Sequence, residues 1–168
     1  MRRIVVLGPG AAGKSTLARA LAESTGLPLV ELDTVFWSAG LAPTPRERWI
    51  EVQRDLAAAD AWILDGDLGP YDALEVRLRR ADAIVLLDLP TWRCAIRAVR
   101  RSQERLDFWR WLLTWRRRYR PKLLQAIEEH APGAEVFVIR NRRDLERLVP
   151  PVRPVGGCRA RRGSAGRR

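Results

Sequence analysis

Residues 8–15 combine glycines, a lysine and a serine at a spacing that suits the binding of a phosphate chain. The stretch reads Gly8-Pro9-Gly10-Ala11-Ala12-Gly13-Lys14-Ser15 and matches G-x-x-x-x-G-K-[ST]. Glycines let consecutive backbone N–H groups converge on one anion, because no side chain stands in the way. Lys14 can reach the outer phosphates of ATP, and the Ser15 hydroxyl can bind Mg²⁺. The expected nucleotide contacts are Gly8, Gly10, Ala11, Ala12, Gly13, Lys14, Ser15 and Thr16.

Three aspartates follow predicted strands and are candidates for metal binding or proton transfer. They are Asp33, Asp65 and Asp88, and ligands of parallel sheets bind beyond the carboxyl ends of the strands. Phosphoryl transfer needs Mg²⁺, so one of these acids should share the metal with Ser15. Asp65 and Asp88 both fit, and we favour Asp65. Asp33, or alternatively Asp67, could orient or deprotonate an acceptor hydroxyl. For each, the alternative is a turn or helix cap.

Arginines crowd the segment 92–122, which holds eleven basic and two acidic side chains. Arg97 and Arg101 lie four residues apart and share a helix face, and Arg117 belongs to a second cluster at 116–120. Arginines that close over a transferred phosphoryl group stabilise its charge and exclude water. We therefore predict catalytic roles for Arg97, Arg101 and Arg117. The alternative is a solvated helix face, and we prefer a core role for the interleaved aromatic residues.

Short apolar runs alternate with helical patterns along the chain. We predict strands at 3–7, 27–32, 61–64, 83–87 and 135–139, and helices at 15–25, 44–59, 72–80, 91–131 and 141–148. Thr44 is predicted to cap the second helix, and the long helical stretch should break near Asp107 and before Pro121. This alternation predicts an α/β protein with three layers and a mostly or wholly parallel sheet.

Composition sets the domain boundary and the cellular setting. The 168 residues carry a net charge of +11, but residues 151–168 contain six arginines and no acid, which leaves +5 on residues 1–150. We expect one domain at 1–150 and a basic, disordered tail at 151–168. Two cysteines and one histidine form no disulfide framework or metal pattern. No apolar run approaches a membrane span, so we expect a cytoplasmic protein.

Several short motifs together resemble the adenylate-kinase-like P-loop proteins known as topology modulation proteins. The resemblance covers residues 1–149 and rests on the glycine loop, Leu32-Asp33 with Phe36-Trp37, Thr44-Pro45-Arg46-Glu47 before Trp49, Trp62-Ile63-Leu64-Asp65-Gly66, Leu87-Asp88-Leu89-Pro90, Phe108-Trp109-Arg110-Trp111 and Arg116-Arg117-Arg118 before Arg120-Pro121. It implies a nucleoside-monophosphate-kinase-like fold with a five-stranded parallel sheet of order 2-3-1-4-5.

The resemblance also implies roles for individual residues. It places Lys14 and Ser15 on the phosphates and Mg²⁺ of ATP, supports Asp65 as the acid on the metal side, and likens Arg97 and Arg101 to the paired arginines of adenylate kinases. The chain departs from that pattern after Gly66, where Asp67 to Pro70 stand in place of Phe-Pro-Arg. The segment 101–107 is also shorter than in related sequences.

The sequence therefore predicts a kinase that uses ATP and phosphorylates a nucleotide, a nucleoside or another small hydroxyl compound. The alternative is a nucleic-acid-associated ATPase or DNA-binding protein, because a basic tail can bind nucleic acid. A GTPase is disfavoured: Asn141 to Asp144 only faintly resembles Asn-Lys-x-Asp, and no Asp-x-x-Gly follows the strand that ends at Asp65.

Overall fold

The computed structural model describes residues 1–37, 42–101 and 106–148. Within these ranges the elements are β1 Arg3–Leu7, α1 Lys14–Thr25, β2 Leu29–Glu31, α2 Leu32–Phe36, α3 Arg46–Ala58, β3 Trp62–Asp65, the 3-10 turn η1 Gly69–Tyr71, α4 Leu74–Leu78, β4 Ala83–Leu87, α5 Thr91–Arg101, α6 Leu106–Arg118, α7 Arg120–His130, β5 Glu135–Ile139 and α8 Arg142–Leu148. The predicted basic tail at 151–168 lies outside them. No helix in these ranges has the length and apolar character needed to span a bilayer.

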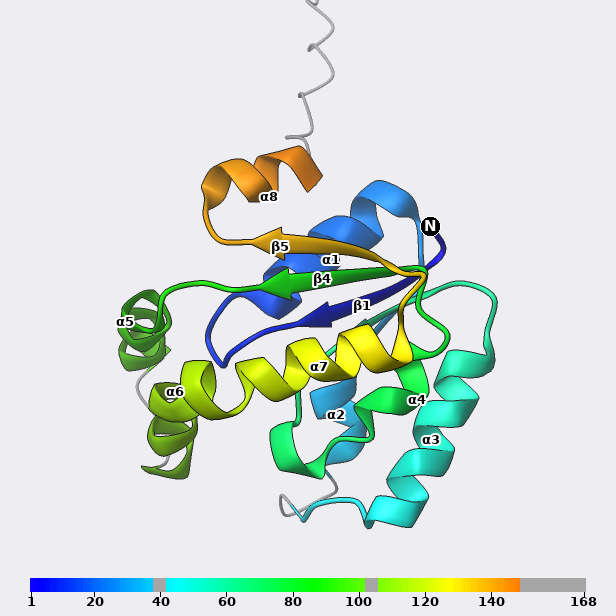
Figure 1. Cartoon of the computed structure of the whole chain (residues 1–168), viewed down its shortest axis with the longest axis horizontal. Helices are drawn as coiled ribbons and strands as arrows, with labels where there is room; N and C mark the ends of the chain where they lie inside the picture. The colour runs from blue at the N-terminus through cyan, green and yellow to red at the C-terminus, as the bar shows by residue number, and fades with distance from the viewer. Residues whose placement is uncertain (38–41, 102–105, 149–168) are drawn as a thin grey trace, which may run out of the picture.

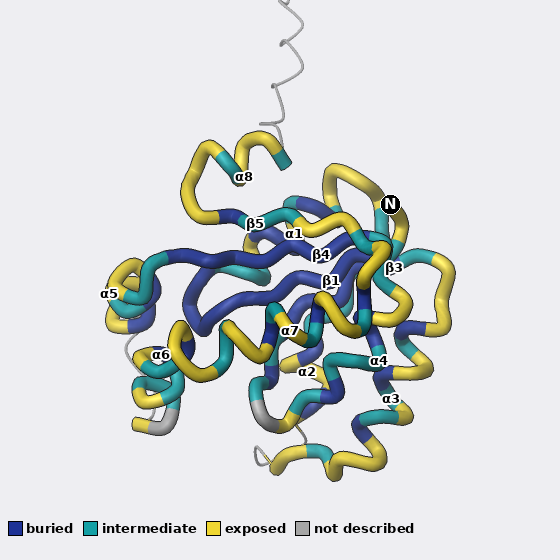
Figure 2. Tube along the Cα trace, viewed as in Figure 1, coloured by how far each residue is buried: buried dark blue, intermediate teal, exposed yellow. Residues whose placement is uncertain are grey.

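The strands form one parallel sheet of order β2-β3-β1-β4-β5 (Figure 1). This confirms the predicted order and the three-layer α/β architecture. The central strand β1 is completely buried from Ile4 to Leu7, as the apolar run predicted, and Figure 2 shows the inner strands as the most buried part of the chain.

Helices cover both faces of the sheet because side chains alternate along each strand. Val5 and Leu7 point to one face and join a core that includes Trp49 of α3, Leu78 of α4 and Leu123 of α7. On the other face, the second core contains Ile4, Val6, Leu17, Leu21, Ile63, Val85, Leu87 and Cys94. The helices α5 and α6 lie near the carboxyl ends of the strands (Figure 1).

The segment after β2 differs from the prediction. The chain enters the short helix α2 at Leu32, so Asp33 lies in its first turn instead of at the end of a strand or in a loop. Leu32 and Phe36, four residues apart, are the buried residues of this helix, and burying this pair explains why the helix forms. Thr44 is not the predicted cap of α3 either: its hydroxyl donates to the Phe36 carbonyl at 2.5 Å.

The long helical stretch does break before Pro121, because α6 ends at Arg118 and α7 begins at Arg120. The break predicted near Asp107 falls beside residues 102–105, which lie outside the described part of the chain. At the other end, Asn141 caps α8 as predicted: its side-chain oxygen accepts from the backbone N–H groups of Arg143 at 2.8 Å and Asp144 at 3.1 Å.

A buried arginine joins the helices on one face of the sheet to the loop that follows β3. Arg77 has no exposed surface. It donates to both carboxylate oxygens of Asp72 at 2.7 Å, to Gln53 at 2.7 Å and to the Gly66 carbonyl at 2.8 Å. Burial alone would raise the pKa of Asp72, but the charge and hydrogen bonds of Arg77 outweigh it and lower that pKa. Arg77 therefore fixes the backbone immediately after Asp65.

Replacing Arg77 with Met should destabilise the fold strongly. Removing one partner of a buried ion pair leaves the other charge buried and uncompensated, which costs about 3–5 kcal/mol. Arg48→Met is the matched control, because Arg48 pairs with Glu51 on the exposed face of α3, and such pairs contribute less than about 1 kcal/mol. Urea unfolding should separate the two variants clearly. Equal unfolding midpoints would contradict the role assigned to Arg77.

Candidate active site

The glycine loop between β1 and α1 has the backbone conformation of an anion cradle. Gly8 and Gly13 have φ of 143° and 96°, and Ala11 has φ of 57°; such residues turn successive N–H groups inward. A Cβ on Gly8 would lie 2.7 Å from the Leu87 carbonyl oxygen, so the loop passes too close to β4 for any side chain. No side chain caps the start of α1, which leaves its first N–H groups available to a phosphate.

Lys14 lies across this loop. Its Nζ donates to the carbonyls of Gly8 at 3.1 Å and Pro9 at 3.2 Å. These contacts hold the ammonium group on the loop, where it can neutralise phosphate oxygens. The loop residues and Lys14 therefore fit the phosphates of a nucleoside triphosphate.

Asp65 and Ser15, the two residues predicted to bind the metal, lie close to each other and to Lys14. Asp65 ends β3 and is 3% exposed, and the Ser15 hydroxyl and the Lys14 ammonium both act on its carboxylate. Its Oδ1 is buried without a hydrogen-bond partner. Burial raises the pKa of Asp65, and Ser15 and Lys14 offset only part of this rise. A buried carboxylate oxygen left free beside a hydroxyl is a suitable donor set for Mg²⁺.

The protein supplies few ligands to such an ion. In the described ranges, no group of three or more histidine, cysteine, aspartate or glutamate side chains could hold a metal. Mg²⁺ commonly binds through one or two protein oxygens, with water and substrate phosphates completing its octahedral shell. Ser15 and Asp65 fit this mode of binding.

Two further carboxylates, Asp33 and Asp67, are affected by the charge of Lys14. Asp33 lines a cavity of about 230 Å³ together with Gly10, Lys14 and Ser15. Although Asp33 keeps solvent access, partial burial raises its pKa, and the positive charge of Lys14 opposes that rise. Asp67 accepts from the Gly69 N–H at 3.1 Å, and burial raises its pKa as well. Both remain candidates for the acceptor side.

Asp88 occupies a different environment from Asp65. It follows β4, is 2% exposed, and accepts hydrogen bonds from Arg116 at 2.9 Å and from Arg120 at 2.9 and 3.1 Å. Arg140 approaches to 3.7 Å. Burial alone would raise the pKa of Asp88, but the hydrogen bonds from Arg120 and Arg116 outweigh it and lower that pKa. Because arginines use its oxygens, the structure favours Asp65 over Asp88 for the metal.

The three arginines predicted to be catalytic differ in their position relative to the glycine loop. Arg97 of α5 donates to the Ala12 carbonyl at 2.7 Å, so it does reach the glycine loop. Arg101 ends α5, but its side chain lies outside the described residues. Arg117 is exposed on α6, and no hydrogen bond or ion pair joins it to the described part of the chain. The sequence placed Arg116 and Arg120 in the same cluster as Arg117 but gave no separate role to either; their spacing of four residues was the available signal for a shared partner.

Aromatic rings of α6 cover the glycine loop. A Cβ on Gly10 would overlap the Phe108 ring and lie 2.7 Å from Trp111. Trp111 contacts Phe108 and Tyr119, with ring centroids 6.0 and 6.3 Å apart, and its Nε1 lies 3.3 Å from a Cβ built on Gly69. The expected core role holds for Trp115, which is 1% exposed. Phe108 differs from Trp115 because it packs against the core and also lines the small cavity together with Asp33.

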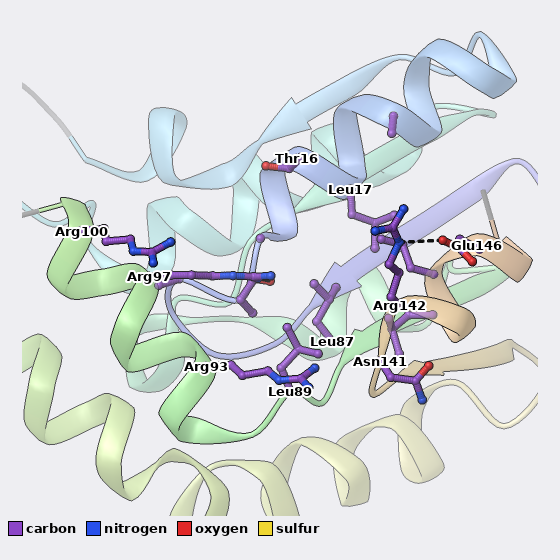
Figure 3. A pocket seen from close by; sticks show the side chains of 16 residues that line it. Thr16, Leu17, Leu87, Leu89, Arg93, Arg97, Arg100, Asn141, Arg142 and Glu146 are labelled. Carbon is purple, nitrogen blue, oxygen red and sulfur yellow. Dashed lines mark hydrogen bonds and ion pairs between the residues drawn. The ribbon is translucent and has the colours of Figure 1, made fainter. Parts of the chain in front are cut away.

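A larger cavity of about 790 Å³, which Asp33 does not line, adjoins the loop at Ala11, Ala12 and Gly13. Arg93, Arg97 and Arg100 of α5 line one side of it, while Asn141, Arg142 and Glu146 line the opposite side (Figure 3). Leu87 and Leu89 contribute apolar surface, and Gly13 and Thr16 connect the cavity to the loop. Its size and its largely apolar lining suit a nucleoside. Of the residues that line this cavity, the sequence had predicted only Arg97 and the loop residues as part of a site.

Comparison with known proteins identifies the fold. No model of a known protein family matches the chain. A cytidylate kinase from Methylobacterium sp. (strain 4-46) is 30% identical over 152 residues, which are 90% of this chain but only 59% of that protein. Shikimate kinase from Acinetobacter baumannii, solved in complex with shikimate, superposes with a TM-score of 0.61 at 23% identity and covers 89% of each chain. The chain has the P-loop kinase fold.

A second solved structure agrees with this P-loop kinase fold. A sugar kinase from Janibacter sp. HTCC2649 matches with a TM-score of 0.54 at 23% identity, over 89% of this chain and 90% of that chain. The nucleoside-monophosphate-kinase-like architecture expected from the sequence is therefore confirmed. Within this fold, the cradle at residues 8–15 and the two cavities flank the end of β1.

Gly10→Ala should weaken ATP binding by about tenfold or more, because overpacking costs about 1–3 kcal/mol and would displace the loop. The backbone at Gly10 does not have positive φ, so only the contact with Phe108 and Trp111 opposes the methyl group. Phe108→Ala in the same chain should restore much of the affinity. Calorimetry of ATP binding measures both effects.

Gly133→Ala is the control for that experiment, since no atom lies within 4 Å of its Cβ position. It should bind ATP like the unaltered chain. Normal affinity in Gly10→Ala, or no recovery in the double variant, would show that the aromatic cover does not constrain the loop.

Proposed function

We propose that this chain is an ATP-dependent kinase that transfers the γ-phosphoryl group to a hydroxyl of a small molecule. The observation that carries the proposal is the free, buried Oδ1 of Asp65 beside Ser15 and Lys14, at the end of the central strands. Asp33 lines the small cavity together with Lys14 and Ser15. A carboxylate that can accept a proton therefore lies at the same cavity as Lys14 and Ser15, which supports an arrangement of the kind that phosphoryl transfer requires.

The donor nucleotide fits the glycine loop and the larger cavity that adjoins it. Backbone N–H groups of residues 8–15 and the ammonium of Lys14 hold the triphosphate, and the 790 Å³ cavity takes the nucleoside. Arg97, bonded to the Ala12 carbonyl, is placed to meet phosphate charge from the α5 side. Mg²⁺, held by Ser15 and directly or through water by Asp65, supplies charge neutralisation at the phosphates.

Transfer then depends on residues that face the reacting oxygen atoms. The acceptor oxygen forms a bond to the γ-phosphorus, the bond from that phosphorus to the β,γ-bridging oxygen breaks, and the hydroxyl proton passes to Asp33. Burial raises the pKa of Asp33, which makes it a better proton acceptor than an ordinary surface carboxylate. Lys14 and Arg97 stabilise the charge that develops. We assign supporting roles of the same kind to Arg101 and Arg117.

We further propose that the chain is one of the topology modulation proteins, on the motifs that carry that resemblance, and that it acts in the cytoplasm, where ATP is available. The cytidylate kinase and the two solved neighbours support kinase activity in general. The alternative of a nucleic-acid-associated ATPase has less support, because Arg77, Arg116 and Arg120 bind carboxylates of the protein itself.

Lys14→Ala tests the proposal directly. The variant should lose most ATP affinity and all turnover, because the loop loses the ammonium group that binds phosphate. Lys122→Ala is the matched control: Lys122 is the second of the two lysines in the sequence and is exposed on α7. ATP affinity is measured by calorimetry, and turnover by ADP release across nucleotides, nucleosides, sugars and polyols. Equal ATP affinity in both variants would contradict the proposed donor site.

A further inference from the structure

One tryptophan of α6 lies against two loops, with a different end of its ring on each. A Cβ on Gly10 would lie 2.7 Å from Cζ3 of Trp111, an atom of the six-membered ring. A Cβ on Gly69 would lie 3.3 Å from Nε1 of the same indole, in the five-membered ring. Gly10 belongs to the glycine loop, and Gly69 begins η1 in the loop that follows β3. Trp111 therefore connects the proposed donor loop with the loop after Asp65.

Neighbouring aromatic rings hold both ends of this indole. Phe108 packs on Gly10, and its ring centroid lies 6.0 Å from that of Trp111. At the other end, the Tyr119 ring lies 6.3 Å from Trp111, and its Cε1 lies 3.9 Å from the Cβ position of Gly69. Trp111 also packs against the cores on both faces of the sheet. Because such interiors are close-packed and transmit strain, a displacement at one end of this rigid ring reaches the other end.

The position of Gly69 determines the geometry of the loop after β3. Arg77 fixes the two ends of this loop through the Gly66 carbonyl and the Asp72 carboxylate. Between these ends, the Gly69 N–H donates to Asp67 at 3.1 Å, and the Gly69 carbonyl accepts from the Asp72 N–H at 3.2 Å. Asp67 is one of the two candidates for the acceptor side. The contact of Trp111 with Gly69 therefore bears on the placement of that carboxylate.

Phosphate binding at the glycine loop acts on the first end of the ring. Under the proposed kinase function, backbone N–H groups of residues 8–15 bind the phosphates of ATP, which restricts the loop and with it Gly10. The ring that packs on Gly10 is then restricted as well, and so is its contact with Gly69. Ordering one site in this way lowers the entropic cost of ordering the second.

We propose that Trp111 is a positioning residue that couples nucleotide binding at the glycine loop to the conformation of residues 66–72. The inference rests on the proposed kinase function, which supplies the ligand of the loop. The acceptor side is then fully ordered only when the donor is bound. Coupling between sites is reciprocal, so a change at Gly69 also alters the affinity for the nucleotide.

Hydrogen exchange of the full chain, with and without Mg²⁺ and a non-hydrolysable ATP analogue, tests the coupling from the donor side. The amides of Gly69 and Asp72 exchange when their hydrogen bonds open, and the analogue should slow this exchange about fivefold or more. Trp111→Phe should still bind the analogue but lose the slowing, because the smaller ring does not reach both loops. Trp109→Phe is the matched control: Trp109 lies on the same helix and packs against one core, and this variant should keep the slowing.

A double-mutant cycle between Gly69 and Trp111 tests the coupling from the other side. Gly69 has φ of 57°, and a methyl group there would press on the indole. Gly69→Ala should weaken binding of the analogue about fivefold or more, although Gly69 lines neither of the two cavities. Gly26→Ala is the matched control, since Gly26 has φ of 71° and no atom of the described residues lies within 4 Å of its Cβ position. With Trp111→Phe in the same chain, Gly69→Ala should no longer change the affinity.

Each measurement has results that would overturn the inference. These are unchanged exchange at residues 66–72 in the unaltered chain, equal slowing in Trp111→Phe, and an effect of Gly69→Ala that is absent, persists without Trp111 or is matched by Gly26→Ala. Loss of analogue binding in Trp111→Phe would also overturn it, because the ring would then serve the donor site alone. In all these cases the unaltered chain still binds the analogue, and the kinase proposal stands. If the unaltered chain does not bind the analogue, the kinase proposal fails and the inference fails with it.

Discussion

The parallel register at the centre of the sheet determines how the candidate site is built. β1 lies between β3 and β4, and Val6 pairs with Asp65 while Leu7 pairs with Leu86. The glycine loop therefore leaves the sheet beside one strand-end aspartate and close to the other. Gly8 allows the loop to pass close to β4, because a Cβ at this position would lie only 2.7 Å from the Leu87 carbonyl oxygen.

The two strand-end aspartates are both buried but are stabilised in opposite ways. Arg116, Arg120 and Arg140 surround Asp88 and compensate its charge inside the protein. Asp65, in contrast, is near only the Ser15 hydroxyl and the Lys14 ammonium among the groups that lower its pKa, and its Oδ1 has no hydrogen-bond partner. An uncompensated buried carboxylate is costly, and a bound cation would remove that cost. Asp88 positions arginines, whereas Asp65 is the residue that fits a metal.

Features that depend on local sequence were predictable. The glycine loop, the five apolar runs, the cap at Asn141 and the break before Pro121 each follow from neighbouring residues, and the structure has them all. The short helix α2 was missed because a single buried pair, Leu32 and Phe36, carries its amphipathic pattern. Asp33 was therefore predicted at the end of a strand but lies in the first turn of α2.

Features that depend on contacts between distant segments were not predictable. The sequence presents Arg116, Arg117 and Arg118 as equivalent, and only the packing of α6 turns Arg116 toward Asp88. Contact between Phe108 and Gly10 likewise joins residues almost a hundred positions apart. The burial of Arg77 follows from its carboxylate partner Asp72 and from Gln53 of α3, which no local pattern indicates.

The central claim is that Asp65, and not Asp88, completes a metal site with Ser15 when a nucleotide is bound. Electron paramagnetic resonance of Mn²⁺, used in place of Mg²⁺, measures this directly in the presence of ATP. The unaltered chain should immobilise Mn²⁺ only when ATP is added. Asp65→Asn should weaken that binding at least about tenfold, since a charged ligand contributes about 1.5–3 kcal/mol, while Asp88→Asn should retain most of it. Equal Mn²⁺ affinity in Asp65→Asn and the unaltered chain, or loss of binding in Asp88→Asn alone, would contradict the account.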